Sequence, residues 1–206
     1  MARIAIIGTG RMAQGLGRGW VRVGHTIIFG SRSPERKAHI AAQVEGAQVA
    51  DPPEALDGAD IVVIAIPYEA VESFAHDYSL WLQGKLVIDI SNPFDHLPDN
   101  RISGAEITAR AIGSDAHVVA AFKANFWQTL LEPVDPSGVV RDVHFAGDDE
   151  RDKQIMAQLI HDLDFRPVDC GPLRNARVLD AMVSLIVELD MRYAAGARRA
   201  SWKLLD

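Results

Sequence analysis

The residues with the clearest chemical meaning form a glycine-rich turn near the start of the chain. Gly8-Thr9-Gly10-Arg11-Met12-Ala13 fits the pattern G-x-G-x-x-G/A, follows an apolar run and opens an amphipathic stretch. Gly8 allows a tight turn, and Gly10 lacks the Cβ that would keep a diphosphate away from the backbone. The N–H groups from Thr9 to Met12 would then face the phosphates from a helix N-terminus, which favours negative charge. The turn therefore predicts a binding site for a ligand that contains a diphosphate.

A second group of polar residues follows the next apolar run. An acidic residue about 20 positions after the glycines accepts hydrogen bonds from the ribose of NAD in proteins that prefer it. This chain instead reads Gly30-Ser31-Arg32-Ser33-Pro34-Glu35-Arg36-Lys37. Ser31 can donate to a 2′-phosphate, Arg32 can pair with it and stack on adenine, and Arg36 adds charge one helical turn later. We therefore expect NADP(H) rather than NAD(H), unless these arginines only begin a solvated helix.

No residues are spaced as an acid–base or metal centre. The seven histidines are scattered, and none has metal-ligand spacing with cysteine or carboxylate, so no metal is expected. Cys170 is the single cysteine, which excludes an internal disulfide and suits a reducing compartment. Hydride transfer between two stacked rings does not need a protein acid or base, so the lack of an identifiable catalytic residue agrees with redox chemistry.

An alternation of strands and helices must position these residues. Short β-branched runs alternate with longer helical patterns, which is typical of a parallel sheet covered by helices. Strands are expected at residues 3–8, 26–30, 48–50, 61–66, 86–90 and 117–122, and helices near 11–23, 34–44, 69–81 and 103–111. The pattern predicts an α/β fold, a Rossmann-type doubly wound parallel sheet over residues 1–121 that binds NADP.

Residues 122–206 repeat the alternation on a smaller scale. Strands are expected at 143–147 and 165–170, and helices at 149–163 and from about 173 onwards. The stretch 130–142 contains Pro133, Pro136 and Gly138, which predicts a loop. We interpret this part as a small carboxy-terminal α/β lobe that completes the active-site cleft.

Composition narrows the classes of partner. The 206 residues carry a formal net charge of -7, which argues against nucleic acid or an anionic membrane as the main partner. The apolar run at 61–66 is far too short to cross a membrane, and residues 1–4 do not resemble a signal peptide. We expect a soluble, cytoplasmic protein.

The chain resembles the F420-dependent NADP oxidoreductases and their NADPH-dependent reductase relatives, a group that includes the cytosolic domain of the six-transmembrane metalloreductases. The resemblance covers almost the whole chain, and the segment Gly171–Arg177 is its most specific part. The matching segments are Ile6-Ile7-Gly8-Thr9-Gly10, Gly24-His25, Gly30-Ser31-Arg32, Ala65-Ile66-Pro67, Ile88-Asp89-Ile90-Ser91-Asn92-Pro93, Ser103-Gly104-Ala105-Glu106, Ala146-Gly147-Asp148-Asp149 and Asp169-Cys170-Gly171-Pro172-Leu173-Arg174-Asn175-Ala176-Arg177.

The resemblance implies that NADP(H) meets a second redox ring, F420 or a flavin, in a cleft of a protein that is often a homodimer. It implies NADP contacts for Thr9 to Met12, Ser31, Arg32 and Arg36. Ile66-Pro67 and Asn92-Pro93 would border the ribose and the nicotinamide. The chain departs from the family at Val118-Val119-Ala120-Ala121-Phe122-Lys123-Ala124, where the family often reads Val-Val-Lys-Ala-Phe-Asn-Thr. The second substrate is therefore left open.

Two other functions remain possible at this stage. The protein could reduce a small carbonyl or imine compound directly, although only 35 residues follow Gly171 and such enzymes usually carry a large helical second domain. It could also be a non-catalytic NADP sensor, although a sensor would not need the segment Gly171–Arg177. The sequence does not distinguish the electron acceptor, the direction of the reaction or the oligomeric state.

Overall fold

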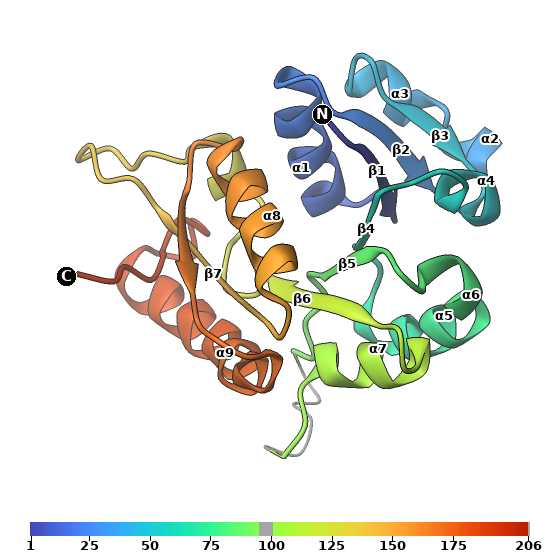
Figure 1. Cartoon of the computed structure of the whole chain (residues 1–206). Coiled ribbons are helices and arrows are strands. Elements are labelled where there is room, and N and C mark those ends of the chain that lie inside the picture. Colours follow the sequence, from blue (N-terminus) through green and yellow to red (C-terminus); the bar gives the residue numbers. More distant parts are fainter. Residues whose placement is uncertain (95–100, 206) are drawn as a thin grey trace.

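A computed structural model describes residues 1–94 and 101–205. One eight-stranded sheet has the order β3-β2-β1-β4-β5-β6-β7-β8 (Figure 1). The strands are β1 (Arg3–Ile7), β2 (Thr26–Gly30), β3 (Gln48–Ala50), β4 (Ile61–Ile64), β5 (Leu86–Asp89), β6 (His117–Ala121), β7 (Asp142–Gly147) and β8 (Arg166–Asp169). The first six are parallel to one another, β7 is antiparallel to β6, and β8 is parallel to β7. The order of the first six strands is that of a dinucleotide-binding fold, which confirms the predicted fold class.

The helices cover both faces of this sheet. They are α1 (Arg11–Arg22), α2 (Pro34–Lys37), α3 (His39–Gln43), α4 (Pro52–Leu56), α5 (Val71–Asp77), α6 (Ser79–Leu82), α7 (Gly104–Ile112), α8 (Glu150–His161) and α9 (Ala176–Tyr193). Three short 3₁₀ turns are η1 (Tyr68–Ala70), η2 (Thr129–Leu131) and η3 (Leu173–Asn175). Within the described residues, no helix has both the length and the apolar character to cross a bilayer.

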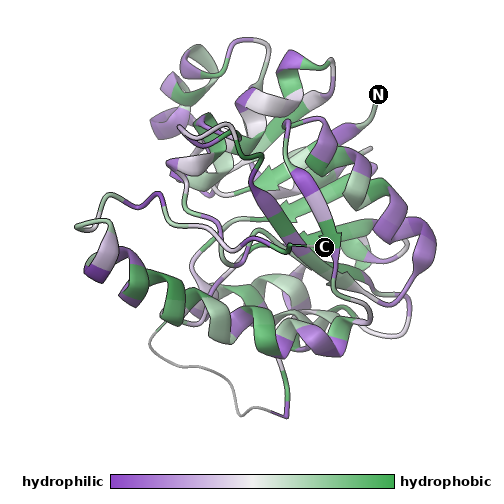
Figure 2. Cartoon of the chain, turned by 90° about the vertical axis from the view of Figure 1, so that its left-hand side faces the viewer, coloured by the Kyte–Doolittle hydropathy of each residue, from purple (hydrophilic) through white to green (hydrophobic). Residues whose placement is uncertain are grey.

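Alternate strand residues enter two separate cores. Ile4 and Ile6 of β1 pack with Trp20 of α1 and with apolar residues of α8, whereas Ala5 and Ile7 pack with residues of α4, α5 and α7. The strands are predominantly hydrophobic, whereas the helices around them mix hydrophobic and hydrophilic residues (Figure 2). Because both faces are covered, β4 is apolar and buried at every position.

Two predicted helices are interrupted in the structure. The helix expected at 34–44 is divided into α2 and α3, because the N–H of Ala41 bonds to the carbonyl of Ala38 in a tighter i to i+3 turn. The helix expected at 69–81 is likewise divided into η1, α5 and α6, with Tyr78 at the second break. Both stretches are helical over most of their length, as expected, but each is made of more than one helix. Local turn geometry overrides the long-range apolar pattern.

Helix α4 was missed, although it has a local signal. Asp51 accepts a hydrogen bond from the N–H of Glu54 at 2.9 Å, and Pro52 occupies the first helical position. An N-cap aspartate followed by proline marks a helix start. The helix has only five residues, too few to show an apolar period.

The predicted boundary after residue 121 coincides with the end of β6. The sheet continues across it, because Ala121 of β6 pairs with Phe145 of β7. Strands β7 and β8 thus extend the first sheet, while α9 packs against α7 and β7. The division of the chain into two domains stays a prediction.

Candidate functional site

The two glycines of the turn between β1 and α1 have different structural roles. Gly8 has φ +116°, and a Cβ there would lie 2.3 Å from the carbonyl oxygen of Ala65. Gly10 has an extended conformation with φ -72° and ψ 178°, and a Cβ there would meet no described atom within 4 Å. The fold itself therefore needs glycine at position 8 but not at position 10.

Helix α1 begins at this turn, and no side chain of its first turn compensates the partial positive charge of its N-terminus. Gly10 is the N-cap, so it provides no capping side chain, and no acidic residue occupies the first turn. The first N–H groups of a helix have no intrahelical acceptor and carry partial positive charge. This helix end can hold an anionic group of a ligand.

Two cavities adjoin the turn along the carboxyl edge of the sheet. The larger has a volume of about 810 Å³, and the smaller of about 480 Å³. Both are lined by Gly8, Thr9, Ile66 and Pro67. Since β1 and β4 are adjacent at the point where the strand order reverses, the cavities lie in the crevice where such sheets bind ligands. The site suits an elongated ligand whose anionic middle lies at the turn.

The smaller cavity contains most of the residues predicted to recognise a 2′-phosphate. Ser31 and Arg32 line it. Arg36 is exposed and is not among the described lining residues, whereas Lys37 is. No role was predicted for Lys37. Spacing in the sequence does not show which of two adjacent helical residues points into a cavity.

The larger cavity contains the remaining predicted contacts except one. Gly10, Arg11, Met12, Ile66, Pro67 and Asn92 line it. Pro93 is buried and is not among the described lining residues. The Nδ2 of Asn92 donates to the carbonyl of Lys123 at 2.9 Å, and its Oδ1 is buried without a hydrogen-bond partner in the described structure. The amide orientation leaves this oxygen as an acceptor for a ligand donor.

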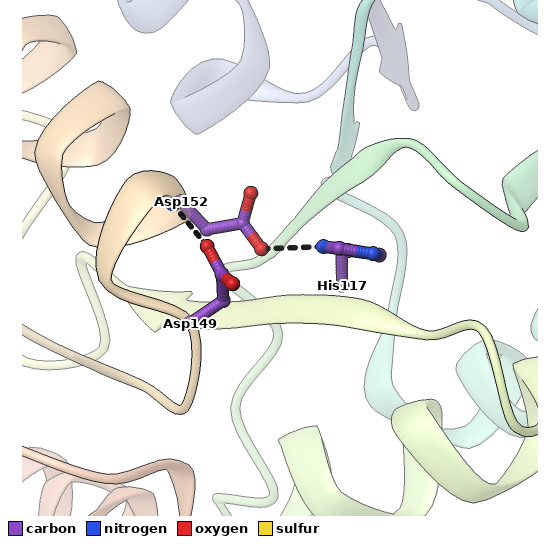
Figure 3. Close-up of side chains that lie close together, drawn as sticks. All are labelled: His117, Asp149 and Asp152. Atoms are coloured by element: carbon purple, nitrogen blue, oxygen red, sulfur yellow. Dashed lines mark hydrogen bonds and ion pairs between the residues drawn. The ribbon is translucent and has the colours of Figure 1, made fainter.

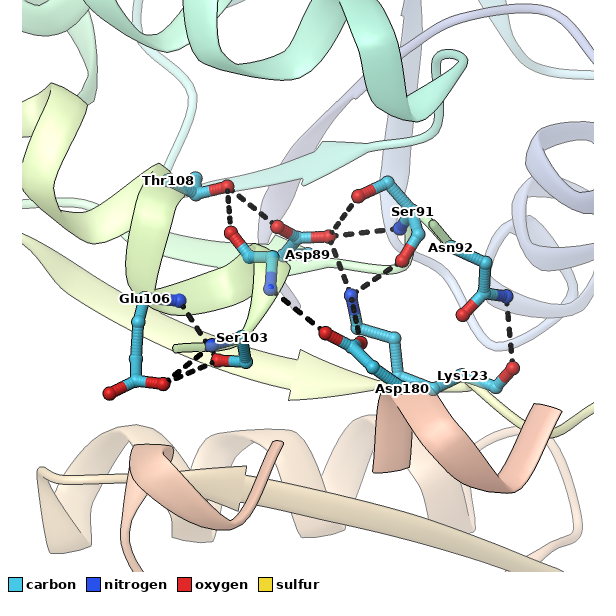
Figure 4. A network of polar contacts seen from close by, with 9 residues as sticks. Asp89, Ser91, Asn92, Ser103, Glu106, Thr108, Lys123 and Asp180 are labelled. Atoms are coloured by element: carbon cyan, nitrogen blue, oxygen red, sulfur yellow. Dashed lines mark hydrogen bonds and ion pairs between the residues drawn. The ribbon is translucent and has the colours of Figure 1, made fainter. Parts of the chain in front are cut away.

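Beside Asn92 lies a network of buried charges that sequence analysis did not identify (Figure 4). The side chain of Lys123 is 1% exposed, and its Nζ lies 3.0 Å from Oδ1 of Asp89 and 3.4 Å from Oδ1 of Asp180. The same Nζ donates to the carbonyl of Ser91 at 2.5 Å. Asp89 also accepts from the hydroxyl of Thr108 at 2.7 Å. The three charged residues are far apart in sequence, so only the packed structure brings them together.

The network divides its charge unequally between the two carboxylates. Burial opposes the charged form of Lys123, but the nearby Asp89 and Asp180 raise its pKa overall. Burial also opposes ionisation of Asp89, yet Lys123 and several hydrogen bonds lower its pKa. Burial raises the pKa of Asp180. Lys123 and Asp89 therefore form the ion pair, and Asp180 is the carboxyl that takes up a proton more readily.

Aromatic side chains line another part of the larger cavity. Phe94, Phe126 and Trp127 lie there, and the guanidinium of Arg11 is 4.8 Å from the centroid of the Trp127 ring. Aromatic faces of this kind can stack on a flat heterocycle. Tyr68 also lines this cavity. Its burial, and to a smaller extent the charge of Asp180, raise the pKa of the phenol, so the phenol stays protonated.

Comparison with known proteins agrees with this arrangement. Residues 3–93 match the family described as NADP oxidoreductase coenzyme F420-dependent. These residues are similar to that family. The chain is also 28% identical to an F420-dependent NADP reductase of Methanocaldococcus jannaschii, over 93% of each protein. It is 30% identical to the human metalloreductase STEAP2, over 86% of this chain but 35% of that protein. The resemblance inferred from the motifs is confirmed.

Solved structures show the same fold over the whole chain. A proposed F420-dependent NADP reductase from Arthrobacter sp. FB24 superposes with a TM-score of 0.91, covers all of both chains and is 22% identical. An imine reductase from Pseudomonas sp. has a TM-score of 0.72, and this chain covers 63% of it. The chain thus spans nearly all of the archaeal reductase but about a third of the metalloreductase. It is an oxidoreductase by family.

Cys170 directly follows β8, the strand at one edge of the sheet. Its Sγ contacts the carbonyl of Val168 at 3.6 Å, and burial raises the pKa of the thiol. It lines neither cavity within the described structure. This environment suits a packed thiol better than a reactive one.

One histidine lies beside two carboxylates, an arrangement that the sequence spacing did not reveal (Figure 3). The Nδ1 of His117 is 2.8 Å from Oδ2 of Asp152, while Asp149 accepts from the N–H of Asp152 at 2.9 Å. The hydrogen bond that His117 donates to Asp152 raises the pKa of the imidazole. These contacts are an ion pair and a helix cap that join β6 to α8, and they account for all three side chains.

Proposed function

We propose that the protein is an NADP(H)-dependent oxidoreductase that transfers a hydride between the nicotinamide ring and a second redox ring, F420 or a flavin. F420 is favoured over flavin because the family description and the archaeal relatives name it. The direct reduction of a small carbonyl or imine is a second candidate, supported by the fold shared with imine reductases.

The observation that carries this proposal is the geometry at Gly10. Neither backbone conformation nor packing requires glycine there, because φ is -72° and a Cβ would meet no described atom. A glycine that the fold does not need, at an uncapped helix N-terminus between two cavities, suits close approach by a ligand diphosphate. The residues present therefore fit a dinucleotide.

The two cavities fit the two halves of such a ligand. Ser31, Arg32 and Lys37 give the smaller cavity the donors and positive charge that a 2′-phosphate needs. The larger cavity offers the acceptor Oδ1 of Asn92 for a ribose hydroxyl or carboxamide N–H. NADP(H) would supply the hydride chemistry when bound. The protein's own residues orient the rings and exclude water.

The decisive experiment is the substitution Gly10→Ala, with Gly8→Ala as its structural contrast. Gly10→Ala should leave the melting temperature within a few degrees of wild type, because the site is open and extended. It should weaken NADPH binding, measured by calorimetry, by about a hundredfold or more, since the new methyl occupies the path of the diphosphate. Gly8→Ala should instead destabilise the fold. Unchanged NADPH affinity in Gly10→Ala would reject the proposed dinucleotide site.

A turnover assay identifies the acceptor. NADPH is mixed with the protein and F420, FMN, FAD or a small cyclic imine in turn, and its oxidation is followed by absorbance. We expect the fastest oxidation with F420. Turnover with the imine alone would favour direct substrate reduction. Tight binding without turnover for every acceptor would favour a sensor.

We also propose that the protein acts in the cytoplasm as a homodimer, as the family resemblance implies. The exposed side chains of Val178, Leu185 and Tyr193 on α9 give an apolar surface for such contact. Sedimentation analysis with the Leu185→Glu variant tests the assembly. A monomeric wild-type protein would contradict it.

A further inference from the structure

We propose that Lys123 is a positioning residue for the proposed hydride transfer, because it fixes the Ser91–Asn92 turn at the wall of the larger cavity. This inference rests on the proposed function. It concerns a residue that does not itself line either cavity within the described structure. Its action must therefore pass through the turn.

The turn is held by Lys123 at two separate points. The ammonium donates to the carbonyl of Ser91 at 2.5 Å, and the main-chain carbonyl of Lys123 accepts from Nδ2 of Asn92 at 2.9 Å. Both Ser91 and Asn92 line the larger cavity. Because the second contact fixes the amide of Asn92, the unpartnered Oδ1 has one orientation. A shift of Lys123 would move this acceptor.

The ammonium also connects the turn to two helices. Asp180 of α9 lies 3.4 Å from Nζ, and its Oδ2 accepts from the N–H of Gly104 at the start of α7, at 2.8 Å. Asp89 at the end of β5 lies 3.0 Å from Nζ. Lys123 is thus the centre of contacts between β5, α7, α9 and the cavity wall (Figure 4).

A stabilising role alone would not require a cation at position 123. Asp89 is already hydrogen-bonded by Thr108 and by the N–H and hydroxyl of Ser91. In addition, Ala120 of β6 is the register partner of Asp89, so a lysine at position 120 could offer a counter-ion from the adjacent strand. In the structure, the contact with the carbonyl of Ser91 is made by the lysine at position 123.

The first test is Lys123→Met, which removes the charge and keeps an unbranched side chain that is one heavy atom shorter. NADPH affinity should change by less than about threefold, because the contacts at the glycine turn and the smaller cavity remain. The fluorescence anisotropy and lifetime of bound NADPH should decrease, because the nicotinamide end is held less firmly. With F420 as acceptor, kcat should fall about ten- to a hundredfold with little change in KM for NADPH. Unchanged fluorescence and kcat in a folded variant would overturn the proposal.

A second variant separates positioning from stability. Lys123→Met leaves a buried carboxylate without its cation and can impair folding. The double variant Ala120→Lys/Lys123→Met supplies a cation beside Asp89 but not the contact with Ser91. We expect it to recover melting temperature without recovering the NADPH fluorescence. Recovery of both would show that Lys123 is only a counter-ion and would overturn the proposal.

Lys153→Met is the matched control. Lys153 is also largely buried, and it pairs with Asp169 at 3.0 Å and Glu150 at 2.7 Å on α8, outside the lining of both cavities. It should lower stability and leave bound NADPH fluorescence unchanged; an equal fluorescence change in this control would overturn a specific role for Lys123. Absence of NADPH binding in the wild-type protein would instead contradict the proposed function itself.

Discussion

Recognition of an extra phosphate depends on single side chains, and neighbouring cations in this chain differ in placement. Ser31 and Arg32 follow β2 directly, and the structure places both at the smaller cavity. Arg36 and Lys37 occupy adjacent positions of α2, but only Lys37 reaches the cavity among the described residues. Successive residues on a helix point about 100° apart, so only one of these two faces the smaller cavity.

This difference gives a prediction at the residue scale. Lys37→Ala should weaken NADPH binding about ten- to a hundredfold, because a charged hydrogen bond to phosphate contributes about 1.5–3 kcal/mol. Arg36→Ala should change it by less than about threefold. Calorimetry with NADPH and NADH checks both variants. Equal weakening for NADH, which lacks the 2′-phosphate, would show that Lys37 does not recognise that group.

At the scale of elements, the start of α7 combines a capping box with an interhelical ion pair. Ser103 and Glu106 bond to one another's backbone N–H groups. Glu106 also accepts from Nε of Arg177 on α9 at 2.8 Å. These contacts join α7 to α9 and so support the region around Gly104 and Asp180. One carboxylate thus caps a helix and fixes the approach of another.

The charge of Glu106 should make stability depend on pH. The hydrogen bond from Arg177 is the main reason that the pKa of Glu106 is lowered from 4.5 to about 2. Because the folded state favours the ionised form, the stabilisation is present above about pH 4.5 and is lost as pH falls towards 2. Glu106→Gln should reduce the free energy of unfolding by about 1–2 kcal/mol at pH 7, allowing for solvent screening. Urea unfolding between pH 7 and 3 measures this, and the difference should narrow on acidification.

The exposed pair of Glu188 and Arg192, one turn apart on α9, serves as the comparison. Glu188→Gln should leave the unfolding transition nearly unchanged at each pH, because exposed ion pairs contribute little. A pH-independent loss in Glu106→Gln would assign its effect to capping rather than to charge.

At the scale of the whole molecule, one buried carboxylate makes several of the contacts by which residues 203 and 204 pack back onto the sheet. Asp142 at the start of β7 is fully buried and accepts from Arg166 at 2.8 Å, from Nζ of Lys203 at 2.6 Å and from the N–H of Leu204 at 2.8 Å. Burial would raise the pKa of Asp142, but these donors lower it to about 2. The chain end, β7 and β8 are thus held as one unit.

Asp142→Asn should release this end of the chain. The loss of a buried charge beside two cations should lower the free energy of unfolding by about 2–4 kcal/mol. Residues 201–205 should exchange amide hydrogens faster, and trypsin should cut at Lys203 more readily. Asp135→Asn, at an exposed turn, is the control. Unaltered exchange near Lys203 in Asp142→Asn would contradict this role.

The strands, their apolar faces and the glycine-rich turn could be predicted from the sequence alone, because these features depend on residues close together in the chain. Gly8 and Gly10, Ser31 and Arg32 were identified in this way. Short helices, such as α4, and the direction in which a helical residue such as Lys37 points were harder to predict. A few residues are too short a stretch to show a clear apolar period. Interruptions within helices also depend on local hydrogen bonding that composition does not reveal.

Which distant residues meet could be known only from the packed chain. Three features depend on contacts across long sequence separations. They are the two cavities that share Gly8 and Ile66 in their lining, the continuation of the sheet into β7, and the network around Lys123. A buried cation is stable only where packing places carboxylates and carbonyls around it. No local pattern specifies such an environment, because its donors and acceptors come from separate strands, turns and helices.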